Sequence, residues 1–164
     1  MALELMRVRL PVLLLLVMSG AAQASECRTR LEPLLNAEEP KDSRSVFELC
    51  EAEATAGDAE AMYYVSFFYF GFDGFGRDTE KGVALARAAA EKGYAQAQYW
   101  LGWQHEIGGH LPQDNAAALE WYRRSAASGY CMASDRLARA HKNGELGLTA
   151  DPTQVQLLPC KRQE

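Results

Sequence analysis

Four cysteines, Cys27, Cys50, Cys131 and Cys160, carry the most reactive side chains in this chain of 164 residues. No two of them form a C-x-x-C pair, so disulfide exchange of the thioredoxin type is not expected. Because residues 1–24 are expected to direct export, an even number of cysteines predicts structural disulfides. We predict Cys27–Cys50 and Cys131–Cys160, each closing a terminal helical hairpin. In both pairs the two cysteines lie at similar distances from the turn between the helices.

His105 and His110 flank a segment that superficially matches a zinc-protease motif. That motif places its histidines four residues apart on one helical face, whereas these are five apart and separated by Gly108 and Gly109. We therefore do not expect a metalloprotease. His105 and His141 are 36 residues apart, and packing within the repeats is favoured over a shared metal site.

Other candidate catalytic groups lack the context that catalysis requires. The glycines between Gly71 and Gly76 join two predicted helices, whereas a phosphate-binding loop follows a strand. The serines carry no nucleophile motif. Nothing in the sequence brings Glu106 and Glu120, a possible hydrolytic pair, into one cleft. We expect no catalytic, cofactor-binding or metal site, and the chain is predicted not to be an enzyme. Hydrolysis of cell-wall glycan or β-lactams is the alternative.

Aromatic residues are concentrated in one short stretch. Half of the 16 aromatic side chains lie between residues 63 and 75. They are Tyr63, Tyr64, Phe67, Phe68, Tyr69, Phe70, Phe72 and Phe75. Residues 64, 67 and 68 would share one face of a helix, because side chains three and four positions apart are neighbours there.

A repeat of 36 residues organises the chain that carries these groups. Glycines recur at 57, 93 and 129, and aspartates recur at 42, 78 and 114, with another at 151. Small residues recur at 61, 97 and 133, and aliphatic residues at 65, 101 and 137. Matching columns at this period are typical of stacked supersecondary units.

Each unit is predicted to be a helical hairpin. The expected helices span 27–37, 43–56, 58–70, 79–92, 95–107, 115–128 and 131–143, and a short one opens at Asp151 and ends before Pro159. An aspartate can cap the second helix of each unit by accepting hydrogen bonds from free backbone N–H groups. A glycine can then end it in the left-handed conformation.

The sequence of residues 93–129 resembles the Sel-one-like repeat, a relative of the tetratricopeptide repeat. The resemblance is carried by Ala97, Leu101–Gly102, Asp114, Trp121 and the segment 126–129. It is good for 57–93 and partial for 129–151. His105 and His141 depart from the family tyrosine, Ser66 from its helix glycine and His110 from its loop glycine. The resemblance implies an α-solenoid that binds other proteins.

The predicted fold class is therefore all-α, a right-handed α-solenoid of about four antiparallel hairpins. The repeat domain spans 25–164. Its N-terminal cap hairpin is 25–56, two repeats cover 57–92 and 93–128, and the C-terminal cap repeat is 129–164. First helices line the inner face of such solenoids. We predict a partner-binding surface there, formed by Tyr64, Phe67, Phe68, Trp100, Trp103, Gln104, Arg136 and Arg139, because aromatic and arginine side chains dominate binding hot spots. The alternative is that these residues pack against neighbouring hairpins.

Residues 1–24 are predicted to be a cleavable secretory signal peptide. Arg7 and Arg9 precede the apolar run Leu10–Met18, and Ala22-Gln23-Ala24 is a suitable cleavage site. The run is too short to span a bilayer. We expect a periplasmic protein with no membrane insertion after cleavage.

Charge is unevenly distributed along the chain, whose net charge is −5. Residues 26–60 contain ten acidic and four basic side chains, whereas residues 121–142 contain five basic side chains and one acid. No overall basic excess favours nucleic-acid binding.

The expected partner is another protein. Short periplasmic members of the family imply an immunity protein that neutralises a secreted toxin, such as a lipase delivered by type VI secretion. The alternative is an adaptor or scaffold in envelope assembly or signalling.

Overall fold

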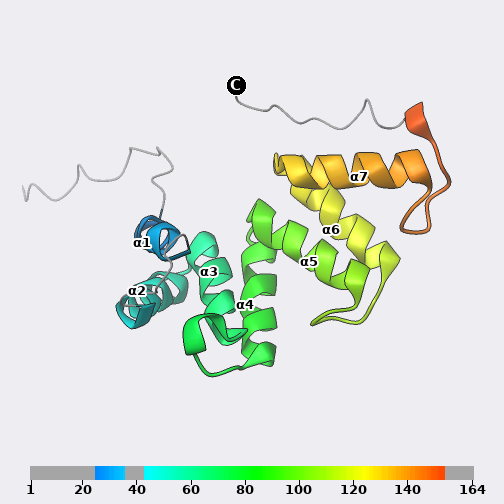
Figure 1. Ribbon diagram of the computed structural model, residues 1–164. Helices are drawn as coiled ribbons and strands as arrows, with labels where there is room; N and C mark the ends of the chain where they lie inside the picture. The colour runs from blue at the N-terminus through cyan, green and yellow to red at the C-terminus, as the bar shows by residue number, and fades with distance from the viewer. Residues whose placement is uncertain (1–24, 36–42, 154–164) are drawn as a thin grey trace, which may run out of the picture.

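The computed structural model describes residues 25–35 and 43–153, and all the regular elements in this part of the chain are helices. Its α-helices are α1 (Glu26–Leu35), α2 (Ser43–Thr55), α3 (Ala59–Tyr69), α4 (Thr79–Glu91), α5 (Ala95–Ile107), α6 (Asn115–Ala127) and α7 (Cys131–Asn143). A short 3-10 helix, η1 (Phe72–Gly74), lies between α3 and α4. Successive helices pack against each other in chain order, and their axes change direction along the array (Figure 1). The predicted all-α repeat fold is confirmed.

Aspartates cap α4 and α6, the second helices of their units, as the repeat predicts, and Asp58 caps the first helix α3 in the same way. Asp58 accepts a hydrogen bond from the Ala61 N–H at 2.7 Å, and Asp78 accepts one from the Lys81 N–H at 3.0 Å. Asp114 accepts from two N–H groups of the first turn of α6. Gly93 follows α4 and has φ +92°, a conformation that favours glycine because it lacks Cβ. From α2 to α7, these local signals explain why the predicted helix bounds lie within about one residue of the observed ones.

A second repeated contact closes each turn. The backbone N–H of Asp78 donates to the Tyr69 carbonyl at 2.8 Å, and that of Asp114 donates to the His105 carbonyl at 2.9 Å. Asp151 donates in the same way to the His141 carbonyl at 2.7 Å. The end of the first helix in each unit is therefore tied to the start of the segment that follows its turn. His105 and His141 keep this role of the repeat although they replace a tyrosine.

The small and aliphatic columns of the repeat form the centre of the core. Ala61, Ala97 and Ala133 have no exposed surface, and the aliphatic residues at 65, 101 and 137 are at most 1% exposed. Gly102 allows α5 and α6 to approach closely, because a Cβ there would lie 2.8 Å from the Tyr122 ring. Side chains of different size thus fill the space between the helices of each hairpin.

A disulfide between Cys27 and Cys50 joins α1 to α2, as predicted. The backbone N–H of Cys27 also donates to the Glu53 carboxylate at 3.3 Å, so α1 is held to α2 at its first turn. Cys131 is bonded in a disulfide. Its predicted partner Cys160 lies outside the described residues, as do the predicted signal peptide and residues 154–164.

Candidate functional site

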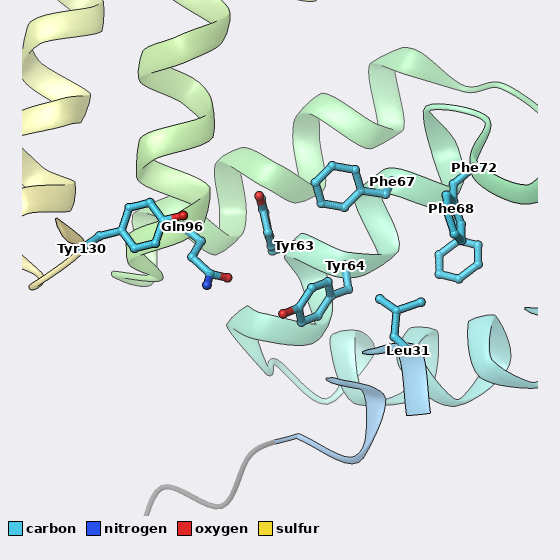
Figure 2. A pocket seen from close by; sticks show the side chains of 8 residues that line it. All are labelled: Leu31, Tyr63, Tyr64, Phe67, Phe68, Phe72, Gln96 and Tyr130. Atoms are coloured by element: carbon cyan, nitrogen blue, oxygen red, sulfur yellow. The ribbon is translucent and has the colours of Figure 1, made fainter. Parts of the chain in front are cut away.

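A cavity of about 390 Å³ lies on the side of the array formed by the first helix of each hairpin (Figure 2). We call it the aromatic cavity. Its lining residues come from α1, α3, η1, α5 and the start of α7. They are Leu31, Tyr63, Tyr64, Phe67, Phe68, Phe72, Gln96 and Tyr130. Its volume is within the range of small ligand-binding pockets.

Helix α3 positions most of the aromatic wall. Tyr63 and Phe67 are four residues apart and meet edge to face, with ring centroids 5.0 Å apart. The Tyr63 ring also packs against those of Tyr64 and Tyr94, with ring centroids 5.6 Å and 5.4 Å apart. Phe68 packs in the core below, where its ring contacts Phe72 at 5.5 Å. The rings hold one another in place, so the wall is largely formed before anything binds.

A carboxylate lies beside this wall, close to Tyr64 and Gln96. Glu60 is one turn before Tyr64 on α3, and the Tyr94 hydroxyl lies 3.0 Å from its Oε1 atom. The same hydroxyl lies close to Oε1 of Gln96, which lines the cavity. Arg28 reaches Glu60 at 3.5 Å but pairs more closely with Glu32 at 2.8 Å.

Burial and the neighbouring charged groups shift the pKa of Tyr64. Burial raises the pKa of the Tyr64 hydroxyl above its ordinary value. A hydrogen bond with Tyr94 and the charge of Arg28 oppose that rise, whereas the carboxylates of Glu60 and Glu32 add to it. Burial also raises the pKa of Tyr63. Both phenols are therefore neutral at physiological pH.

A second, smaller cavity of about 220 Å³ lies beside the first and is lined by Tyr99, Met132, Asp135, Arg136 and Arg139. Tyr99 and Tyr130 connect the two cavities, because Tyr130 lines the aromatic cavity and their ring centroids are 5.3 Å apart. A continuous surface therefore runs from α1 to α7.

The predicted binding residues divide into two groups. Tyr64 and Phe67 line the aromatic cavity, and Arg139 lines the second one. Trp103 is 44% exposed but lines neither cavity. These four residues therefore keep exposed or cavity-facing surface, and their role in binding stays a prediction.

The other four residues are buried, although Phe68 borders the aromatic cavity and Arg136 borders the second one. Phe68 is 1% exposed, Trp100 7%, Gln104 2% and Arg136 6%. Trp100 is covered because it stacks with Phe70, at a centroid distance of 5.1 Å. Phe70 in turn stacks on His110 of the loop between α5 and α6, at 4.6 Å.

The buried polar residues of this group are used inside the repeat. Gln104 accepts a hydrogen bond from the His110 N–H at 2.8 Å, which holds the loop over the core. Arg136 pairs with Glu106 at 2.6 Å and with Glu145 at 2.7 Å. Its guanidinium is thus fully engaged by α5 and by the segment after α7.

Several lining residues were not predicted as site residues. Gln96 and Tyr130 lie at the N-terminal ends of α5 and α7, whereas the prediction considered only the middle of the inner helices. Leu31 comes from the cap hairpin, where the repeat pattern is weakest. Tyr63 and Phe72 belong to the aromatic run, which was the available signal for the cavity.

The residues singled out as candidates for metal binding or hydrolysis have other contacts in the structure. Within residues 25–35 and 43–153, no three histidine, cysteine or acidic side chains gather as a metal site requires. Glu106 pairs with Arg136, and Glu120 pairs with Arg124 on the surface of α6. In the same part of the chain, no helix is long and apolar enough to cross a membrane.

An array of helical hairpins with a cavity along its inner helices defines an α-solenoid of the repeat-protein class. The sequence matches the Sel1 repeat over residues 59–94, 95–130 and 132–154, which is more than half of the chain. The chain therefore belongs to the Sel1 repeat family.

Solved structures show the same architecture. A Sel1 repeat protein from Oxalobacter formigenes is 26% identical, with a TM-score of 0.69 over 80% of this chain and 54% of its own. A protective antigen of uropathogenic Escherichia coli strains, with an SLR fold, is 31% identical. Its TM-score is 0.59 over 64% of this chain and 22% of its own.

Two curated relatives are larger fungal proteins. A chitin synthase regulator of Malassezia restricta is 30% identical over 73% of this chain, and chitin synthase regulatory factor 3 of Schizosaccharomyces pombe is 32% identical over 74%. The aligned part spans only 9% and 12% of those proteins. The similarity therefore concerns the repeat module alone.

Proposed function

We propose that this protein is a non-enzymatic module that binds another protein through the aromatic cavity and the surface continuing to α7. The observation that carries the proposal is the cavity itself, a largely preformed aromatic hollow on the inner helices of a solenoid. Repeats of this family generally mediate protein–protein interactions. Stacked hairpins form a rigid frame whose inner side chains can vary without disturbing the repeated core.

Site-specific crosslinking tests this binding surface. Benzoylphenylalanine replaces Gln96 on the cavity wall in one variant and Arg123, exposed on α6 outside both cavities, in the other. We expect irradiation of the native cells to crosslink one protein partner to the Gln96 variant and not to the Arg123 variant. Equal crosslinking at both positions, or none at Gln96, would contradict the proposal.

The partner identified in this way allows a quantitative test. Phe67→Ala removes a cavity wall that is not part of the fully buried core. Truncation of a central binding residue costs about 2 kcal/mol, so we expect roughly 30-fold weaker binding of the purified partner. Circular dichroism controls for folding. An unchanged affinity would place the interface elsewhere.

We further propose that the partner is a toxin acting in the periplasm, such as a lipase delivered by type VI secretion, and that this protein neutralises it. The Cys27–Cys50 disulfide supports an oxidising compartment. The names of the two curated relatives describe regulation of an enzyme, which supports an enzyme as the partner. The alternative is an adaptor in envelope assembly or signalling.

Two measurements decide between these roles. Mass spectrometry of the periplasmic fraction should find a mature N-terminus at Ser25, and an intact leader would contradict export. The partner captured by the Gln96 crosslink should be toxic when it is expressed alone in the periplasm. Co-expression of this protein should then protect the cells, and Phe67→Ala should abolish that protection. Failure of the native protein to protect would favour the adaptor role.

A further inference from the structure

The walls of the aromatic cavity are suited to a positively charged group. Six of its eight lining residues are aromatic, and the other two are Leu31 and Gln96 (Figure 2). The face of an aromatic ring carries negative charge density, so a cation close to the ring face is attracted to it. None of the lining residues carries a positive charge that would repel such a group.

The charges beside the wall favour the same occupant. Glu60 and Glu32 both act on Tyr64, and Arg28 is the one basic group among the charges that do so. These three groups leave one net negative charge beside the cavity. The wider N-terminal part has the same sign, with ten acidic and four basic side chains between residues 26 and 60.

Glu60 retains the capacity to bind a further cation. A carboxylate accepts about four hydrogen bonds. The contacts of Glu60 with the Ser25 N–H and with Arg28 are both long, at 3.5 Å, and only the Tyr94 hydroxyl is closer, at 3.0 Å. The Glu60 side chain is 16% exposed, so a pair formed there would be partly shielded from water.

We propose that the aromatic cavity binds an arginine side chain of the partner protein, a specificity that rests on the proposed protein-binding function. The apolar stem of the arginine lies against Phe67 and Leu31. Its planar guanidinium stacks on the ring of Tyr63 or Tyr64 and pairs with Glu60. Arginine suits the site better than lysine because its guanidinium is weakly hydrated and stacks on aromatic faces.

Small amides that each carry one side chain test the proposal by NMR titration. The probes are N-acetylarginine methylamide, its neutral citrulline isostere and the leucine equivalent. We expect the arginine probe to shift the backbone amides of Tyr63, Gln96 and Tyr130 in a saturable way. A desolvated cation–π contact strengthens binding by about tenfold or more, so the citrulline probe should bind about tenfold more weakly.

Glu60→Gln removes the negative charge beside the cavity while it keeps the size of the side chain. It should weaken binding of the arginine probe several-fold and leave binding of the leucine probe unchanged. Glu91→Gln, an exposed change of the same charge at the end of α4, should leave both unchanged. Equal affinity for arginine and citrulline, or tighter binding of leucine, would overturn the proposal.

The probe titration and the Gln96 crosslink distinguish a wrong arginine specificity from a wrong protein-binding function. If the Gln96 crosslink captures a protein but the cavity prefers leucine, the protein-binding function stands and the arginine specificity is wrong. If the arginine probe binds selectively but no protein is crosslinked, the specificity stands and the protein-binding function is wrong.

Discussion

Gly102 is a residue at which two general effects on stability have opposite signs. Helix propensity alone predicts that Gly102→Ala stabilises α5 by about 1 kcal/mol. The added Cβ, however, would lie 2.8 Å from Cδ1 of Tyr122, which is fully buried. Overpacking of this kind costs about 1–3 kcal/mol, so we expect a lower free energy of unfolding in urea. A more stable variant would show that the two helices separate easily.

Arg136 and Arg139 lie on the same helix but differ in what they stabilise. Arg136 is 6% exposed and pairs with Glu106 and Glu145, whereas the Arg139 side chain is 62% exposed. Arg136→Ala leaves the Glu106 carboxylate without its cationic partner in a largely buried place, and we expect a loss of about 3 kcal/mol in unfolding free energy. Arg139→Ala serves as the control and should change it by less than about 1 kcal/mol.

The effect of Arg136→Ala should depend on pH. Burial alone would raise the pKa of Glu106, but hydrogen bonds from Arg136 and Tyr122 outweigh it and hold that pKa below the ordinary value of 4.5. The stabilisation by ionised Glu106 is fully present above pH 4.5 and is lost as the pH falls through the lowered folded-state pKa. The difference in unfolding free energy between the native protein and Arg136→Ala should shrink in that pH range. A difference that stays constant with pH would show that it does not come from the ionised Glu106.

At the scale of the helix, Asp114 joins two roles in one residue. Its carboxylate accepts hydrogen bonds from Ala116 and Ala117, while its own N–H donates to His105. Asp114→Ala removes only the two hydrogen bonds to the carboxylate. We expect the free energy of unfolding, measured by thermal unfolding, to fall by about 1 kcal/mol. Asn115→Ala, an exposed change at the next position, should be within about 0.5 kcal/mol of the native protein. Equal effects at both positions would contradict the capping role.

The elements were largely predictable because each carries its own local signals. Aspartates and glycines mark the ends of the helices, and the bounds of α5 and α7 agree with the prediction. Burial of individual side chains was less predictable. The position of Phe68, Gln104 and Ala140 in the repeat is buried in every unit, whatever residue occupies it. The prediction instead inferred exposure from the place of these positions on the inner face of the first helices.

Of the three predicted inner columns, only that of Phe67, Trp103 and Arg139 keeps some exposure in every unit. Trp100 and Arg136 share a column and are buried by contacts that no repeat pattern encodes. The first is covered through Phe70 and His110, and the second is engaged by Glu106. Such contacts depend on loop residues and on one particular neighbour, so they required the structure.

For the whole molecule, the Cys27–Cys50 disulfide holds the first hairpin on the array. It closes a loop of 23 residues, and Cys27→Ser with Cys50→Ser should lower the stability of this hairpin by about 3 kcal/mol. Within the described residues the main contacts join successive helices, so hydrogen exchange should become faster in α1 and α2 and change little in α6. Uniformly faster exchange would indicate that the solenoid unfolds as one unit.

The same disulfide affects the thermodynamics of ligand binding. Helix α1 has ten residues, contains Pro33 and contributes Leu31 to the cavity wall. A helix this short is marginally stable alone. With the crosslink in place, the wall is ordered before a ligand arrives, and binding loses little conformational entropy. In the reduced protein the ligand would have to order α1 itself. Calorimetry should then record a more unfavourable entropy of binding, with faster dissociation of the same complex.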